Sequence, residues 1–327
     1  MANRKFNFEN IGNTGFSTSN TTTEGGRLNN KDGSVNIQKT GLPFWEKISL
    51  FHTLLRLPRT TFLLIIFLFY TVLNTFFALI YVFVGVEHLH GIHDDISLMG
   101  RFEQAFFFSS QTLTTVGYGH ISPVGTAANI VASLESFIGI LAFALVTGLL
   151  YGRFSRPQAY LLFSKNVLIA PYRGITGLMA RVVTYKNNHI TDAEANVTLV
   201  IHINENGTKV RRFFNLPLEI KKVNSMALSW TLVHPINEES PLYQMSYEEI
   251  KDADIEVLYH IKGFDDHFSN TVQQRTSYIF PELVYGAKFL PMFHRSEDGS
   301  TTILEIDKVN DHEHALLPEI VNSPVNM

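Results

Sequence analysis

The sequence predicts a mixed membrane protein in which two membrane-spanning helices, with a re-entrant segment between them, precede a β sandwich. Two long apolar runs, a glycine- and threonine-rich segment between them, and a second half of short alternating segments carry this prediction. The 327-residue chain is 45% hydrophobic with a net charge of −4, which suits a smaller membrane part joined to a larger soluble part. Zero cysteines exclude a disulfide framework, a thiolate metal site and a cysteine nucleophile. The mild acidity argues against a nucleic-acid partner.

The first membrane helix is predicted over residues 60–86, an apolar run without a charged side chain. A helix of that length spans roughly 40 Å, more than the ~30 Å hydrocarbon core. The second helix is predicted over residues 127–153, where Glu135 is the one carboxylate. Basic residues lie before the first helix and after the second, while the connecting segment is mainly acidic. The positive-inside rule therefore predicts a multi-pass protein of the cell (inner) membrane with both termini in the cytoplasm.

The segment between the two helices, RFEQAFFFSSQTLTTVGYGH, is too short to cross the membrane again. It predicts a re-entrant pore helix and filter over residues 102–119, because irregular backbone at membrane depth must be enclosed by protein or line a water-filled path. Glycines at alternate positions allow successive carbonyls to face one axis. Four such strands could replace the water shell of K⁺. The filter residues would be Thr115, Val116, Gly117, Tyr118 and Gly119. The alternative is an ordinary glycine-rich turn.

Four motifs carry a family resemblance: TTVGYG, FSRP, LSWTLVHPINEESPLY and GFDDHFSNTVQQRTSYIFPELVYGAKF. They resemble the inward-rectifier potassium channels, especially their prokaryotic branch, over about residues 31–307. The resemblance implies a homotetramer, so that three identical subunits are partners of each chain. It also implies a two-helix pore per subunit and a cytoplasmic immunoglobulin-like β domain that extends the pore inward. K⁺ in the filter would be the only metal, with no other cofactor.

The β domain is also predicted from its own residues. Segments 195–203 and 208–216 alternate with a period near two and suggest a hairpin turning near Asn206-Gly207. Another turn is predicted over residues 297–299, and the repeated short strands favour a β sandwich. The predicted parts are a largely mobile N-terminal segment (1–40), a slide helix (41–59), a transmembrane pore domain (60–157), the β sandwich (158–310) and an unstructured tail (311–327).

An interfacial slide helix is predicted because apolar residues recur at helical spacing before Pro58, which stops the helix. The alternative is an amphipathic connector that packs on protein. Anionic lipid could bind where the helices leave the membrane. The candidate lipid-binding residues are Trp45, Lys47, Arg56, Arg59, Arg153 and Arg156. Because the stretch after the second helix has only two arginines, phosphoinositide activation and lipid inhibition are both open.

Two sets of residues are expected to support and gate the pore. Glu135 either hydrogen-bonds behind the filter to Ser or Thr groups of the pore helix or faces the ions. Relatives often brace the filter with a glutamate and an arginine, whose positions Gln111 and Ile121 occupy here. Gln111 and Thr114 are the other predicted supports.

Phe143 and Tyr151 lie eight residues apart, near one face of the second helix. Rings from four chains could close the pore as a hydrophobic gate, or they could face lipid. Gly139 and Gly148 are expected to let the helix bend.

The resemblance places an inner-pore loop at Lys262, Gly263, Phe264, Asp265 and Asp266. In strongly rectifying relatives acids occupy the positions of Phe143 and Lys262, so block by intracellular Mg²⁺ or polyamines is expected to be weak. Asp265 and Asp266 either add negative potential or are turn acids on a solvated surface. The HLHGIH segment is interpreted as part of an outer loop in preference to a metal site.

The predicted function is a potassium-selective channel, gated at the inner helix ends by the cytoplasmic domain and anionic lipid. A nonselective cation channel and a membrane-anchored ligand-sensing receptor with a β domain are the alternatives. Tyr118 argues against the first, and the glycine-alternating segment argues against the second. An enzyme is not expected, because no pattern specifies a nucleophile with its base or a set of metal ligands.

Overall fold

The structure, a computed structural model, describes residues 27–38, 40–41, 43, 49–92, 97–186, 188–205 and 208–318. Contacts within the chain divide it into two compact units. We call Thr40–Arg156 the helical unit, and Met1–Lys39 together with Pro157–Met327 the β unit. Each unit is described by itself.

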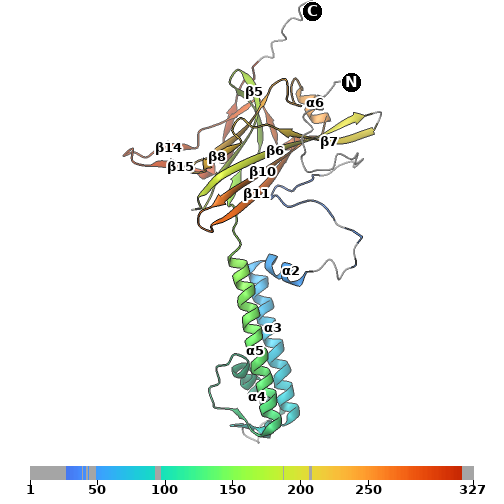
Figure 1. The fold of residues 1–327 in the computed structure, drawn as a ribbon, viewed down its shortest axis with the longest axis vertical. Helices are drawn as coiled ribbons and strands as arrows, with labels where there is room; N and C mark the ends of the chain where they lie inside the picture. Colours follow the sequence, from blue (N-terminus) through green and yellow to red (C-terminus); the bar gives the residue numbers. More distant parts are fainter. Residues whose placement is uncertain are drawn as a thin grey trace, which may run out of the picture. The chain divides into compact units, whose positions relative to one another are not determined.

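The helical unit contains two helices that are long and apolar enough to cross a membrane (Figure 1). They are α3, Arg59–Val84, and α5, Gly125–Phe154, close to the predicted 60–86 and 127–153. The re-entrant helix α4, Leu98–Leu113, begins before the predicted residue 102, because the Ser97 hydroxyl caps it by accepting from the N–H of Gly100. The links around α4 contain a 3-10 helix, η2 (Val86–His88), and a short ladder of β1 (Leu89–His90) with β2 (Ser122–Pro123).

A short helix, α2, Leu50–Arg56, precedes α3. The Ser49 hydroxyl caps its first turn by accepting from the N–H of His52. The helix ends before Pro58, because proline has no N–H to continue the ladder. Within the slide helix predicted over 41–59, the described residues Leu50–Arg56 are helical. Trp45 and Lys47 lie outside the described residues.

The backbones of α4 and α5 come close together at Gly139. A Cβ atom built on Gly139 would lie 2.0 Å from the carbonyl oxygen of Leu113, the last residue of α4. Only a residue without a side chain permits this approach. The sequence assigned Gly139 to a bend, but α5 is one continuous helix through Gly139 and Gly148, and the role that the structure gives Gly139 is close packing. A Cβ on Gly148 would meet nothing within 4 Å.

Two five-stranded sheets form the body of the β unit (Figure 1). The first has the order β12-β4-β5-β3, with β9 paired to β5, and the second β11-β10-β6-β7, with β8 paired to β6. The strands of the first sheet are β3 (Leu161–Phe163), β4 (Val167–Tyr172), β5 (Ile175–Thr184), β9 (Trp230–Ile236) and β12 (Leu283–Tyr285). Those of the second are β6 (Ile190–Glu205), β7 (Thr208–Leu216), β8 (Lys222–Ser225), β10 (Glu256–Asp265) and β11 (Asn270–Ile279).

Apolar side chains from both sheets share one buried core, as the alternating pattern predicts for a sandwich. Leu178 and Val182 of β5 and Val197 of β6 are fully buried in it. The predicted hairpin joins β6 to β7, with Glu205 paired to Thr208, while its two turn residues lie outside the described residues.

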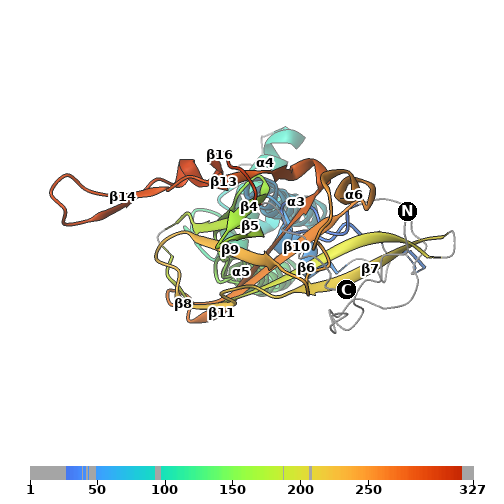
Figure 2. The ribbon, with the colours of Figure 1, turned by 90° about the horizontal axis from the view of Figure 1, so that it is seen from above.

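Smaller elements complete the β unit. A hairpin of β14 (Phe293–Arg295) and β15 (Thr302–Leu304) extends away from the sheets (Figure 2). The predicted turn at residues 297–299 joins these two strands. The other elements are α6 (Tyr247–Asp252), η3 (Phe280–Glu282), β13 (Ala287–Phe289), η4 (Ile306–Asn310) and β16 (His312–His314).

Two segments predicted to be mobile are ordered in part. The tail prediction is wrong for residues 312–314, because β16 pairs with β13. The N-terminal prediction is wrong for the segment around Leu28 and Asn29. The buried carboxylate of Glu256 accepts the N–H of Leu28 at 2.9 Å and that of Asn29 at 3.2 Å. Arg27 and Glu282 add an ion pair at 2.9 Å.

The contact between α4 and α5 predicts that alanine substitutions at two glycines of α5 affect stability differently. Gly139→Ala should lower the thermal stability of the purified protein in detergent, because overlap with the Leu113 carbonyl forces backbone shifts that cost about 1–3 kcal/mol. Gly148→Ala is the matched control. It should leave stability unchanged or raise it by up to ~1 kcal/mol, since alanine favours helix and the site has room. Equal melting temperatures for the two variants would contradict this assignment.

Candidate functional site

The extended stretch after α4 alternates its backbone conformation. Thr115, Gly117 and Gly119 have φ angles of 60°, 54° and 78°, while Val116 and Tyr118 between them do not adopt positive φ. Glycine adopts this left-handed region without cost, whereas threonine rarely does. In the single chain the whole stretch is exposed, so its backbone is available to other subunits. Alternation of this kind allows successive carbonyls to face one axis.

The end of α4 anchors the start of this stretch through backbone groups. The carbonyl of Gln111 accepts the N–H of Val116 at 2.9 Å and that of Gly117 at 3.3 Å. Gln111 therefore holds the extended stretch through its backbone carbonyl. The Thr114 hydroxyl donates to the carbonyl of Ser110 at 2.6 Å and so closes the last turn of α4. Both interactions hold the stretch to the helix before it.

A buried polar network joins α3, α4 and α5 behind this stretch. Glu135 of α5 accepts the hydroxyl of Ser109 at 2.5 Å and that of Tyr81 at 2.7 Å. The Ser109 hydroxyl lies 3.1 Å from the side-chain oxygen of Asn74. Asn74, Ser109 and Glu135 are fully buried. This arrangement agrees with the first role considered for Glu135, hydrogen bonding to the pore helix.

Sequence reasoning did not identify Tyr81 or Asn74 as parts of this network. Both are polar side chains inside an apolar span, and that signal could have found them. A polar group at membrane depth needs an internal partner, and Glu135 was the one strong acceptor available in the neighbouring span.

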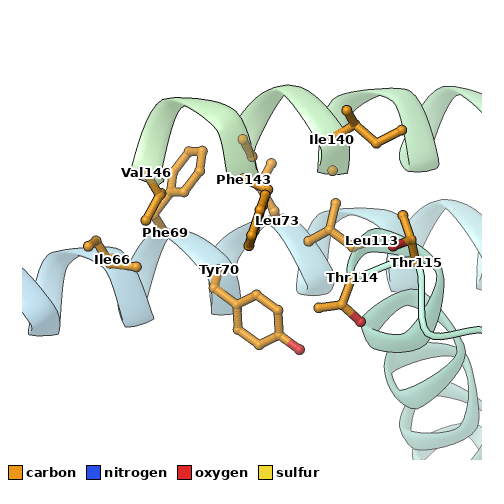
Figure 3. Close-up of a pocket in the computed structure, with 12 residues that line it drawn as sticks. Ile66, Phe69, Tyr70, Leu73, Leu113, Thr114, Thr115, Ile140, Phe143 and Val146 are labelled. Atoms are coloured by element: carbon orange, nitrogen blue, oxygen red, sulfur yellow. The ribbon is translucent and has the colours of Figure 1, made fainter. Parts of the chain in front are cut away.

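An apolar cavity of about 410 Å³ lies between α3, α5 and the end of α4 (Figure 3). Thr115 and Phe143 both line it, so the start of the extended stretch and the predicted upper gate residue border the same space. The remaining lining residues are Ile66, Phe69, Tyr70, Leu73, Leu113, Thr114, Gly139, Ile140, Ala142 and Val146. Phe143 and Tyr151 expose 76% and 73% of their surface in the single chain, which leaves both rings available to neighbouring subunits or lipid.

The four described basic residues at the inner ends of the membrane helices differ in their surroundings. Arg56, Arg59 and Arg156 are exposed. Arg153 is half-buried, and its guanidinium group donates to two backbone carbonyls, those of Leu54 and Leu57, at 2.8 Å each. Its donors are therefore less available to lipid phosphate than the prediction assumed.

The predicted inner-pore loop is wrong for Lys262 to Asp265, which are the last residues of strand β10, and only Asp266 lies in the turn before β11. The two acids differ in their surroundings. Asp265 is fully buried, and its carboxylate accepts the N–H groups of His267 and Phe268 at 2.9 and 3.1 Å. Asp265 therefore holds the turn through its carboxylate, and its burial contradicts the alternative of a turn acid on a solvated surface. Asp266 is half-exposed and lies 2.8 Å from His189, whose hydrogen bond lowers the pKa of the Asp266 carboxyl.

The pairing of β10 with β6 has a β-bulge between Lys262 and Phe264. Lys262 and Phe264 are exposed, while Gly263 between them is buried. A Cβ on Gly263 would lie 2.4 Å from Ile190 on β6, so a glycine is needed where the two strands approach. Among the described residues no group of three acidic or histidine side chains could hold a metal, and His93 of the HLHGIH segment lies outside them.

Comparisons with known proteins match both units. Residues 60–156 match the family model described as ion channel, and residues 161–323 match that described as inward rectifier potassium channel C-terminal domain. The inward rectifier potassium channel Kirbac3.1 of Paramagnetospirillum magnetotacticum is 35% identical over 280 residues, covering 84% of this chain and 91% of the relative.

More distant relatives match over a similar length. The G protein-activated inward rectifier potassium channel 2 of Pongo abelii is 28% identical and that of Homo sapiens 27% identical, each over 309 residues that cover 86% of this chain and 70% of the relative. These matches identify an ion channel and not an enzyme, with a membrane pore domain followed by a cytoplasmic β-rich domain in the tetrameric arrangement typical of such channels. The chain therefore belongs to the inward-rectifier potassium channel family, in its prokaryotic branch.

Proposed function

We propose that four copies of the stretch from Thr115 to Gly119 form the selectivity filter, where rings of backbone carbonyls replace the water shell of K⁺. The alternation of left-handed residues along the stretch is the observation that carries this proposal. The exposure of the stretch in the single chain supports it, because a filter must present its backbone to a shared axis. The Thr115 hydroxyl would be the innermost ligand, and the Tyr118 ring would hold the rings apart.

Support for the filter comes from behind it. Gln111 and Thr114 hold its first residues through the end of α4, and Glu135 holds α4 through Ser109. Carbonyl rings select ions only while their spacing is maintained, so a support that cannot reach water or ions suits this role. The full burial of Glu135 favours it as a brace over a charge that faces the ions.

We further propose that the gate lies at the inner end of α5, where Tyr151 rings from four subunits exclude water. The exposed ring of Tyr151 and the basic residues that follow it support this position. Phe143 would form a second apolar constriction nearer the filter. Anionic lipid would act on the exposed arginines Arg56, Arg59 and Arg156, together with Trp45 and Lys47, with both termini in the cytoplasm.

The filter proposal predicts that Gly117→Ala abolishes K⁺ flux while the tetramer still assembles. A Cβ on Gly117 would meet nothing within 4 Å in the chain, so the effect would come from its φ of 54°, which alanine resists. Gly299→Ala is the matched control, because Gly299 has a φ of 69° and equally open space but lies in the β14–β15 turn. K⁺ flux into liposomes is the measurement. Normal selective flux in Gly117→Ala would refute the filter assignment.

The gate proposal predicts that Tyr151→Ala raises basal K⁺ flux, because removal of four rings widens an apolar constriction. Tyr151→Phe should keep the low flux of the unmodified protein, since the ring and not the hydroxyl excludes water. Flux from liposomes of fixed lipid composition measures both variants. Unchanged flux in an assembled Tyr151→Ala tetramer would move the gate elsewhere, first to Phe143.

Rectification is predicted to be weak, because the two positions that carry acids in strongly rectifying relatives hold Phe143 and Lys262 here. Aromatic rings attract a polyamine by only about 0.5–2 kcal/mol, less than a ring of four carboxylates in a confined pore. Current recorded against voltage with internal spermine should be shallow and should steepen in Phe143→Asp but not in Phe143→Asn. Steep block of the unmodified protein at positive potentials would show this reasoning to be wrong.

A further inference from the structure

Arg153, in the last turn of α5, contacts the corner where α2 meets α3. Its Nη1 donates to the carbonyl of Leu54 at 2.8 Å and its Nη2 to the carbonyl of Leu57 at 2.8 Å. The centre of the guanidinium group lies 4.4 Å from the centroid of the Phe62 ring. One side chain of α5 thus holds two backbone carbonyls and one aromatic ring of the preceding helices.

The Leu54 carbonyl needs an external partner because of the residue four positions ahead. In a continuing helix it would accept the N–H of residue 58, but Pro58 has none. The last carbonyls of every helix lack intrahelical donors, and an unsatisfied one in apolar surroundings is costly. Arg153 supplies that donor and reaches the Leu57 carbonyl with the other arm of the same planar fork.

The surroundings of the Arg153 fork are apolar. Leu55, Phe62 and Leu149 form a buried cluster at the corner, with exposed fractions of 9%, 2% and 7%. Hydrogen bonds from a charged donor are stronger than neutral ones, and low local polarity strengthens them further. The attachment between α5 and the corner should therefore resist small displacements of either helix.

Tyr151 lies two residues before Arg153 on the same helix. At about 100° per residue, the two side chains point roughly 200° apart around the axis. Arg153 therefore faces the corner while Tyr151, 73% exposed, faces away from it. A displacement of the corner would move the same helical turn that carries the Tyr151 ring.

We propose that Arg153 is a positioning residue that makes the α2–α3 corner and the inner end of α5 move together, and that it does not act as a ligand for lipid phosphate. Its outer donors are directed at the two carbonyls, whereas the neighbouring Arg156 is exposed. This inference rests on the proposed gate at Tyr151 for its effect on conduction. The attachment itself does not depend on that gate.

The test compares Arg153→Lys with Arg153→Gln in purified tetramers, first in phosphatidylcholine vesicles and then with phosphatidylglycerol added. Lysine keeps the charge but presents a compact ammonium in place of the planar fork. Both variants should raise hydrogen exchange of the α2 amides by about tenfold, as expected for loss of a charge-assisted hydrogen bond. Both should also change K⁺ flux in the same direction in the two kinds of vesicle.

A lipid ligand would behave differently. Arg153→Lys would then keep the wild-type response to phosphatidylglycerol, only Arg153→Gln would lose it, and α2 exchange in phosphatidylcholine would not change. That result overturns the proposal. Arg56→Lys and Arg56→Gln, at an exposed position of α2, provide the contrast expected of a lipid contact.

Two further measurements keep the test decisive. If Arg153→Gln fails to assemble, Phe62→Leu removes the ring beside the guanidinium and leaves both carbonyls, so α2 exchange should rise by only about threefold. No rise in Phe62→Leu would then count against the proposal. The exchange readout does not need conduction, so a lack of K⁺ flux in the unmodified protein would refute the proposed function alone.

Discussion

The membrane interior offers no water to polar groups, and the helical unit is organised around this constraint. Glu135 and Gly139 lie one turn apart on α5, and they meet Ser109 and Leu113, which lie one turn apart on α4. Glu135 accepts a hydrogen bond from Ser109, and Gly139 allows the backbone of α5 to approach the Leu113 carbonyl. Tyr81 satisfies the second oxygen of the Glu135 carboxylate from α3. The end of α4 is thereby held in place where the proposed filter begins.

Different interactions govern the inner end of the helical unit. At the end of α2 the Leu54 carbonyl lacks a helical hydrogen-bond donor, because Pro58 has no N–H. Arg153 satisfies that carbonyl and that of Leu57. Arginine often binds lipid headgroups, but Arg153 instead joins the end of α5 to the corner between α2 and α3. The exposed arginines nearby keep the chemistry that anionic lipid recognises.

The β unit connects to the helical unit through two stretches of chain. One follows α5 and leads to β3, and the other runs from the N-terminal segment to α2. The N-terminal segment is held on the β unit by Glu256, a buried carboxylate whose hydrogen bonds to the amides of Leu28 and Asn29 offset the cost of its burial. The chain therefore joins the β unit to α2 on one side and to α5 on the other.

The sequence by itself determined the two spans, the re-entrant helix and the alternating strands, because apolar run length and periodicity are local properties. It also located the glycines of the proposed filter, since a positive φ angle favours glycine at an individual position.

Only the tertiary structure decided which polar groups meet. The sequence found Glu135 but not its partner Tyr81, and it assigned Gly139 to a bend and Arg153 to lipid. The ordered N-terminal segment was missed as well, because Glu256 lies more than two hundred residues from the amides of Leu28 and Asn29, whose hydrogen bonds it accepts. Such contacts depend on how distant segments approach, and a local pattern does not contain that information.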